Sequence, residues 1–69
     1  MKKEKFLDTC FTNDEWLTAI MLSRGYTIKT IADRLSVSTG TVSGHIAALV
    51  RETGTRSKTA AIAKLAQYI

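Results

Sequence analysis

The sequence predicts a small all-α domain of four helices. Three observations carry this prediction: the chain has only 69 residues, it contains no proline, and its apolar residues recur at helical spacing instead of alternating as in strands. With 45% hydrophobic and 23% charged residues, the composition is that of a globular domain and not of a disordered chain. So short a chain buries only ~60% of its unfolded surface, which argues against an enzyme with an enclosed pocket.

The first helix is predicted to begin at a capping box after a short N-terminal tail, residues 1–10; the domain itself spans residues 11–69. The Thr12 side chain can accept from the amide of Glu15, whose carboxylate can reach back to the amide of Thr12. Phe11 and Trp16 stand at the two positions of a hydrophobic staple. Gly25 is expected to end this helix of roughly 12 residues in a left-handed conformation.

Two helices with hydroxyl N-caps follow. Thr27 caps a helix of roughly eight residues, and Ser38 caps one of roughly 14 residues that Gly54 ends. The connection, Ser36 to Ser38, is too short for antiparallel packing and forces a crossing of about 90 to 120 degrees. The pattern therefore predicts a helix-turn-helix.

Ser57 is expected to cap the fourth and last helix, of roughly 11 residues. Its predicted apolar side consists of Ala61, Ile62, Leu65, Ala66 and Ile69.

The charge distribution favours a polyanionic partner for the second half of the chain. The formal net charge is +4, and residues 25–69 carry six basic side chains against two acidic ones. In a helix-turn-helix, the second helix leaves its outer face free for the major groove of DNA. Helix pairs of this shape also occur in purely structural bundles, so spacing alone leaves both interpretations open.

No metal, cofactor or membrane segment is expected. The chain has one cysteine, Cys10, and one histidine, His45, which is interpreted as a packed, hydrogen-bonded residue on the inner side of the third helix. The longest apolar run, Ile46 to Val50, is far shorter than the roughly 20 residues of a spanning helix. The basic start of the chain lacks the apolar stretch of a secretory signal, so a cytoplasmic location is expected.

Several motifs are distinctive when they are taken together. They are Phe11-Thr12 with Glu15, Gly25, Ile31-Ala32-x-x-Leu35, Ser38-x-x-Thr41-Val42-x-x-His45, and Gly54. From Phe11 to about Ala66 the chain thus resembles the LuxR/GerE-type DNA-binding domain of bacterial transcription regulators. The resemblance implies that the third helix is the recognition helix, that the fourth commonly supplies the dimer contact, and that the partner is duplex DNA.

The predicted contact residues combine helix caps, the outer face of the third helix and nearby cations. The residues expected to contact DNA are Thr27, Lys29, Ser38, Thr39, Gly40, Thr41, Ser43, Gly44, Ala47, Arg51 and Arg56. The resemblance places a homodimer contact at Ala61, Leu65, Tyr68 and Ile69.

The recognition helix departs from the family pattern in its outward residues. Ser43, Gly44 and Ala47 stand where long polar side chains are common, and short side chains offer no bidentate base contact, which is worth ~1–3 kcal/mol of discrimination. Each helical glycine also costs ~0.5–1 kcal/mol relative to alanine. One interpretation is close approach to the bases, with the methyl groups of Ala47 or Thr41 against thymine methyls. The other is a flat strip on which another helix backbone packs.

Two functions follow from these interpretations. The first is a sequence-specific, DNA-binding transcriptional regulator that acts as a small stand-alone dimeric module, since 69 residues leave no room for a sensor domain. The second is a modulator that pairs with a larger regulator or with RNA polymerase and binds DNA weakly or not at all.

Overall fold

A computed structural model of the chain describes residues 11–68, which fold into four α-helices and a short 3-10 turn. The elements are α2 (Asn13–Ser23), α3 (Ile28–Leu35), α4 (Thr39–Thr53), α5 (Lys58–Leu65) and η1 (Ala66–Tyr68). The predicted tail, residues 1–10, together with Cys10 and Ile69, lies outside the described residues. No helix in the described part of the chain is long and apolar enough to cross a bilayer.

The predicted helix starts are confirmed by their caps. Thr12 Oγ1 accepts from the Glu15 amide at 3.2 Å while Glu15 Oε1 accepts from the Thr12 amide at 2.9 Å, completing the capping box. The side chains of Thr27, Ser38 and Ser57 each accept from the amide three residues on. Because caps depend on neighbours in sequence, they could be read directly from the chain.

The fourth helix differs from the prediction. It keeps α-helical bonding only to Leu65, and Ala66–Tyr68 tighten into a 3-10 turn. The segment contains no glycine that could take the left-handed conformation of a C-cap, and terminal turns without such a cap often adopt 3-10 bonding.

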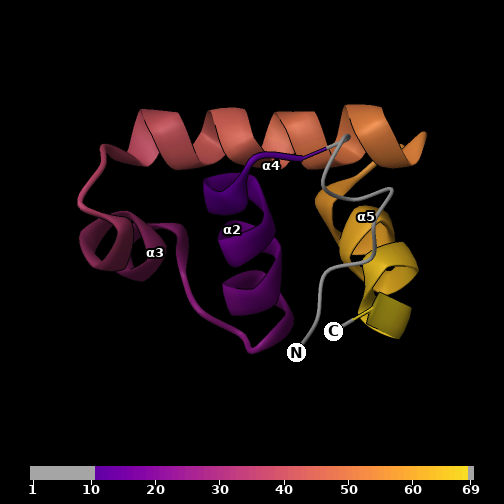
Figure 1. Cartoon of the computed structure of the whole chain (residues 1–69), viewed down its shortest axis with the longest axis horizontal. Coiled ribbons are helices and arrows are strands. Elements are labelled where there is room, and N and C mark those ends of the chain that lie inside the picture. Colours follow the sequence, from indigo (N-terminus) through magenta and orange to yellow (C-terminus); the bar gives the residue numbers. More distant parts are fainter. Residues whose placement is uncertain (1–10, 69) are drawn as a thin grey trace.

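The core consists of two clusters that share α4 as a common wall. One joins α2, α4 and α5 around Trp16, Leu49 and Leu65; the other joins α3 to α4 through Ile31 and Val42. Figure 1 shows α4 lying across α2, α3 and α5, which all stand on one side of it. The helix is therefore held by three others on its inner side, and no other helix of residues 11–68 lies on its opposite side.

Candidate nucleic-acid interface

The turn between α3 and α4 is held by backbone geometry that the sequence did not signal. Ser36 adopts the left-handed conformation with φ 58°, and the Val37 amide donates to the Ala32 carbonyl at 3.0 Å. Serine enters this region at a steric cost, and no glycine marks the position. The three-residue connection directs α4 away from α3, and Val37 and Val42 both pack with the α3 residues of the second cluster.

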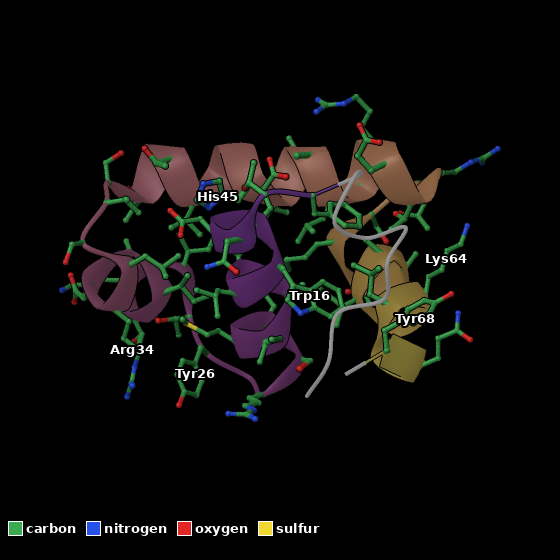
Figure 2. All side chains as sticks on the ribbon, viewed as in Figure 1. Trp16, Tyr26, Arg34, His45, Lys64 and Tyr68 are labelled. Atoms are coloured by element: carbon green, nitrogen blue, oxygen red, sulfur yellow. The ribbon has the colours of Figure 1, made fainter. Side chains whose placement is uncertain are left out.

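The outer face of α4 is open to solvent. Five outward residues of the helix, from its first turn to its middle, carry nothing longer than a threonine side chain; they are Thr39, Gly40, Ser43, Gly44 and Ala47, and all are exposed. The other six predicted DNA contacts are exposed as well: three on helices (Thr41, Arg51 and Lys29) and three on connections (Ser38, Thr27 and Arg56). Figure 2 shows this edge of α4 turned away from the three helices beneath it.

The two helical glycines are not required by the fold itself. A Cβ atom at Gly44 would meet nothing within 4 Å, and one at Gly40 would meet only Ser38 Oγ at 3.7 Å, an ordinary contact. Neither glycine has a positive φ. The flat outer strip of α4, defined by Gly40, Ser43, Gly44 and Ala47, thus has no explanation in packing or backbone conformation.

The N-terminus of α4 offers backbone donors beside this strip. Ser38 Oγ accepts from the Thr41 amide at 3.1 Å and lies 3.0 Å from Thr41 Oγ1. The amides that precede Thr41 in the first turn have no acceptor within the helix, because the first four amides of any helix lack one. Free amides at the positive end of a helix dipole are ligands for a phosphate.

Cations flank the strip near the other end of α4. The Arg51 side chain is 70% exposed, and its Nε lies 3.6 Å from the carboxylate of Glu52, the one ion pair within residues 11–68. A pair so exposed holds its partners weakly, so Arg51 remains available to a phosphate. Arg56 in the connection to α5 and Lys29 on α3 are exposed and have no ion pair among the described residues.

His45 is placed on the opposite, inner side of α4, as the sequence predicted. Its Nδ1 lies 3.1 Å from Thr18 Oγ1 of α2, and Thr18 Oγ1 in turn donates to the Asp14 carbonyl at 2.8 Å. Figure 2 shows the ring between α4 and α2. His45 is therefore a link between helices, and its partner Thr18, which is fully buried, was not identifiable from the sequence.

Comparison with known protein families identifies the family of this helix-turn-helix domain. Residues 9–65 match the family of bacterial regulatory proteins described as the luxR family. The chain belongs to the LuxR family. The fold and DNA-binding transcriptional regulation are thereby those of this family, whose members bind through the helix-turn-helix rather than catalyse a reaction. Searches of curated proteins and of solved structures gave no match.

The predicted dimer contact of this LuxR-family domain needs correction. Ala61 and Leu65 are only 1% and 2% exposed, because they pack inside the chain's own core with Phe11, Trp16 and Leu49. They therefore offer no surface to a second copy. Tyr68 is half-buried against the same core, and the outer side of α5 carries the exposed Ala60 and Ala63.

Proposed function

We propose that the 69-residue chain binds duplex DNA sequence-specifically by itself, with α4 in the major groove, and regulates transcription as a pair of copies on a repeated site. The observation that carries the proposal is that all eleven predicted contact residues are exposed while the inner side of α4 is fixed to three helices. A rigid helix with an open outer face is what major-groove entry requires.

The proposed contacts fall into two groups: those that position the protein on the DNA and those that read the base sequence. The N-termini of α3 and α4, with Lys29, Arg51 and Arg56, are suited to phosphates, which fix the register of the protein without reading sequence. The flat outer strip is suited to close approach, with the Ala47 methyl group against thymine methyls and one hydrogen bond from Ser43. In this proposal, the affinity of the protein for DNA comes from phosphate contacts, and its selectivity comes from small apolar contacts with the bases.

The proposed pairing would use the outer side of α5. With roughly three or four phosphate contacts per copy, one copy would have only modest affinity at physiological salt, and two copies on repeated half-sites would multiply it. Ala60 and Ala63 are exposed on α5, and short side chains allow two helices to approach closely.

Fluorescence anisotropy with a labelled random duplex tests DNA binding. We expect association at low salt that weakens steeply as salt rises, because cations released from DNA drive binding. Arg51→Glu should reduce the affinity at least about tenfold, by removing one phosphate contact and adding a like charge. Lys58→Glu is the matched control, since it changes the net charge equally at an exposed position outside the proposed contact set.

The second candidate function is the protein-interaction modulator. The flat outer strip favours it because the strip lacks the long polar side chains that make bidentate base contacts. It predicts no duplex binding even near 50 mM salt, where a phosphate-dependent complex should be strong.

For the DNA-binding proposal, equal losses of affinity in Arg51→Glu and Lys58→Glu would show that binding follows net charge and not the proposed interface.

A further inference from the structure

A hollow of about 330 Å³ lies between the end of α2 and the start of α5. It is lined by Leu22, Gly25, Tyr26, Lys58, Thr59 and Ile62. Its apolar walls are half-buried and continue the core: Ile62 packs against the first cluster, Tyr26 against the second, and Leu22 against both. The hollow is therefore a rigid apolar surface at the seam of the two clusters, large enough for one apolar side chain.

The rim of the hollow is positively charged. Lys58 lines it directly, and the Arg34 guanidinium lies 4.9 Å from the centroid of the Tyr26 ring. No acidic residue lines the hollow, and within residues 11–68 neither cation takes part in an ion pair. An apolar floor with one unneutralised cation in its lining and another against the Tyr26 ring complements an acidic segment that carries an apolar side chain.

The hollow lies apart from the outer face of α4. Figure 2 shows Tyr26 and Arg34 pointing away from α4, on the far side of the molecule from its outer face. None of the residues that line the hollow belongs to α3 or α4. A duplex bound along α4 would leave the hollow accessible, so both surfaces could be occupied together.

We propose that this hollow is a docking site for a protein partner that presents an acidic segment with one apolar side chain, which inserts between Tyr26 and Ile62 while its carboxylates pair with Lys58 and Arg34. The inference goes beyond the proposed function and does not depend on it. An acidic segment is favoured over a second copy of this chain, because the hollow's own cationic rim would face like charge in a symmetric pair.

The test is a titration of the ¹⁵N-labelled chain with the blocked hexapeptide Asp-Glu-Phe-Ser-Asp-Glu, followed by backbone amide shifts. We expect saturable shifts at Gly25 and Thr59 with a Kd below about 1 mM. Replacing the phenylalanine of the peptide by serine should weaken binding at least about fivefold, because the apolar floor then loses its occupant.

Matched charge reversals separate docking from general attraction of an acidic peptide. Lys58→Glu should weaken peptide binding at least about tenfold, whereas Lys29→Glu, with the same charge change on α3, should change it less than about twofold. Equal losses in the two variants, or shifts confined to α4, would overturn the proposal. It would also be overturned if the free chain sedimented as a dimer that Lys58→Glu dissociates, since the hollow would then be covered by a second copy.

Discussion

At the scale of single residues, Thr18 determines how the recognition helix is attached. Its hydroxyl has one proton, which goes to the Asp14 carbonyl at 2.8 Å, so the contact at 3.1 Å to His45 requires that Nδ1 of the ring donates. The proton of a neutral His45 is thereby placed on Nδ1. The bond joins the middle of α2 to the middle of α4 and fixes how α4 is rotated about its axis.

Thr18→Val tests this link. Valine keeps the shape of the side chain but leaves the His45 Nδ1–H without an acceptor in a half-buried position, which should lower the free energy of unfolding by about 1–3 kcal/mol. Urea unfolding measures the loss, and Thr59→Val, at an exposed position, should change stability by less than about 0.5 kcal/mol. Equal stability of the two variants would show that the hydrogen bond contributes nothing.

Gly44→Ala separates stability from recognition. Because a Cβ here meets nothing within 4 Å, alanine should stabilise the fold by about 0.5–1 kcal/mol, seen as a higher Tm. The added methyl group protrudes from the flat outer strip, so affinity for a selected duplex should fall at least about threefold. Ser23→Ala, at the end of α2 remote from α4, should leave DNA affinity unchanged. A stabilised Gly44→Ala variant with undiminished DNA affinity would argue against close approach of α4 to the bases.

Residue-level features were predictable from sequence where their cause is local. Thr12, Thr27 and Ser38 satisfy amides three positions away, so their roles follow from sequence spacing. Thr18 and Ser36 could not be anticipated, because burial of a hydroxyl depends on a partner 27 residues away and serine carries no strong signal for positive φ.

At the scale of helices, one lysine adds a hydrogen bond to the apolar contacts that join α4 and α5. Lys64 Nζ donates to the Thr53 carbonyl at 2.7 Å, where α4 ends before the left-handed Gly54. A cation at the C-terminus of a helix satisfies an unpaired carbonyl and opposes the negative end of the dipole. Thr53, whose own hydroxyl bonds the Leu49 carbonyl at 2.7 Å, is thus held from both sides.

Lys64→Met should loosen this joint. Methionine keeps the apolar part of the side chain but removes the donor, so we expect a loss of about 1 kcal/mol in the free energy of unfolding. Chemical denaturation compares this variant with Lys58→Met, which removes a cation that has no hydrogen-bond or ion-pair partner within residues 11–68. The same denaturation midpoint in the two variants would show that the hydrogen bond from Lys64 adds no stability, because water competes for its donor and acceptor.

Helix order, the helix-turn-helix and the apolar side of α5 around Ala61 and Leu65 followed from the sequence. Periodicity could not tell whether that apolar side packs against the chain's own core or against a second copy. The core takes up Ala61 and Leu65 together with Trp16 and Leu49, a choice that depends on tertiary packing. The same choice removes both residues from any dimer surface.

At the scale of the whole molecule, α4 serves both the core and the proposed interface. Its inner side supplies Val42 to one cluster and Leu49 to the other, while its outer side carries the flat outer strip. The reading surface is therefore as rigid as the core behind it. We infer that selectivity in this domain depends on helix placement more than on adaptable side chains, since Ser43 is the one residue of the strip with a rotatable side chain.

The dependence of DNA affinity on salt tests the proposed pairing of two copies. Each phosphate contact contributes about −0.9 to the slope of log K against log salt concentration, so roughly three or four contacts give a slope near −3 for one copy and about −5 to −7 for two. We expect the steeper value on a duplex selected from a random pool, measured by anisotropy across several salt concentrations. Arg51→Glu should make the slope shallower by about one for each bound copy, because each loses one phosphate contact. A slope near −3 would mean that a single copy binds, which would refute the pairing and leave DNA binding itself intact.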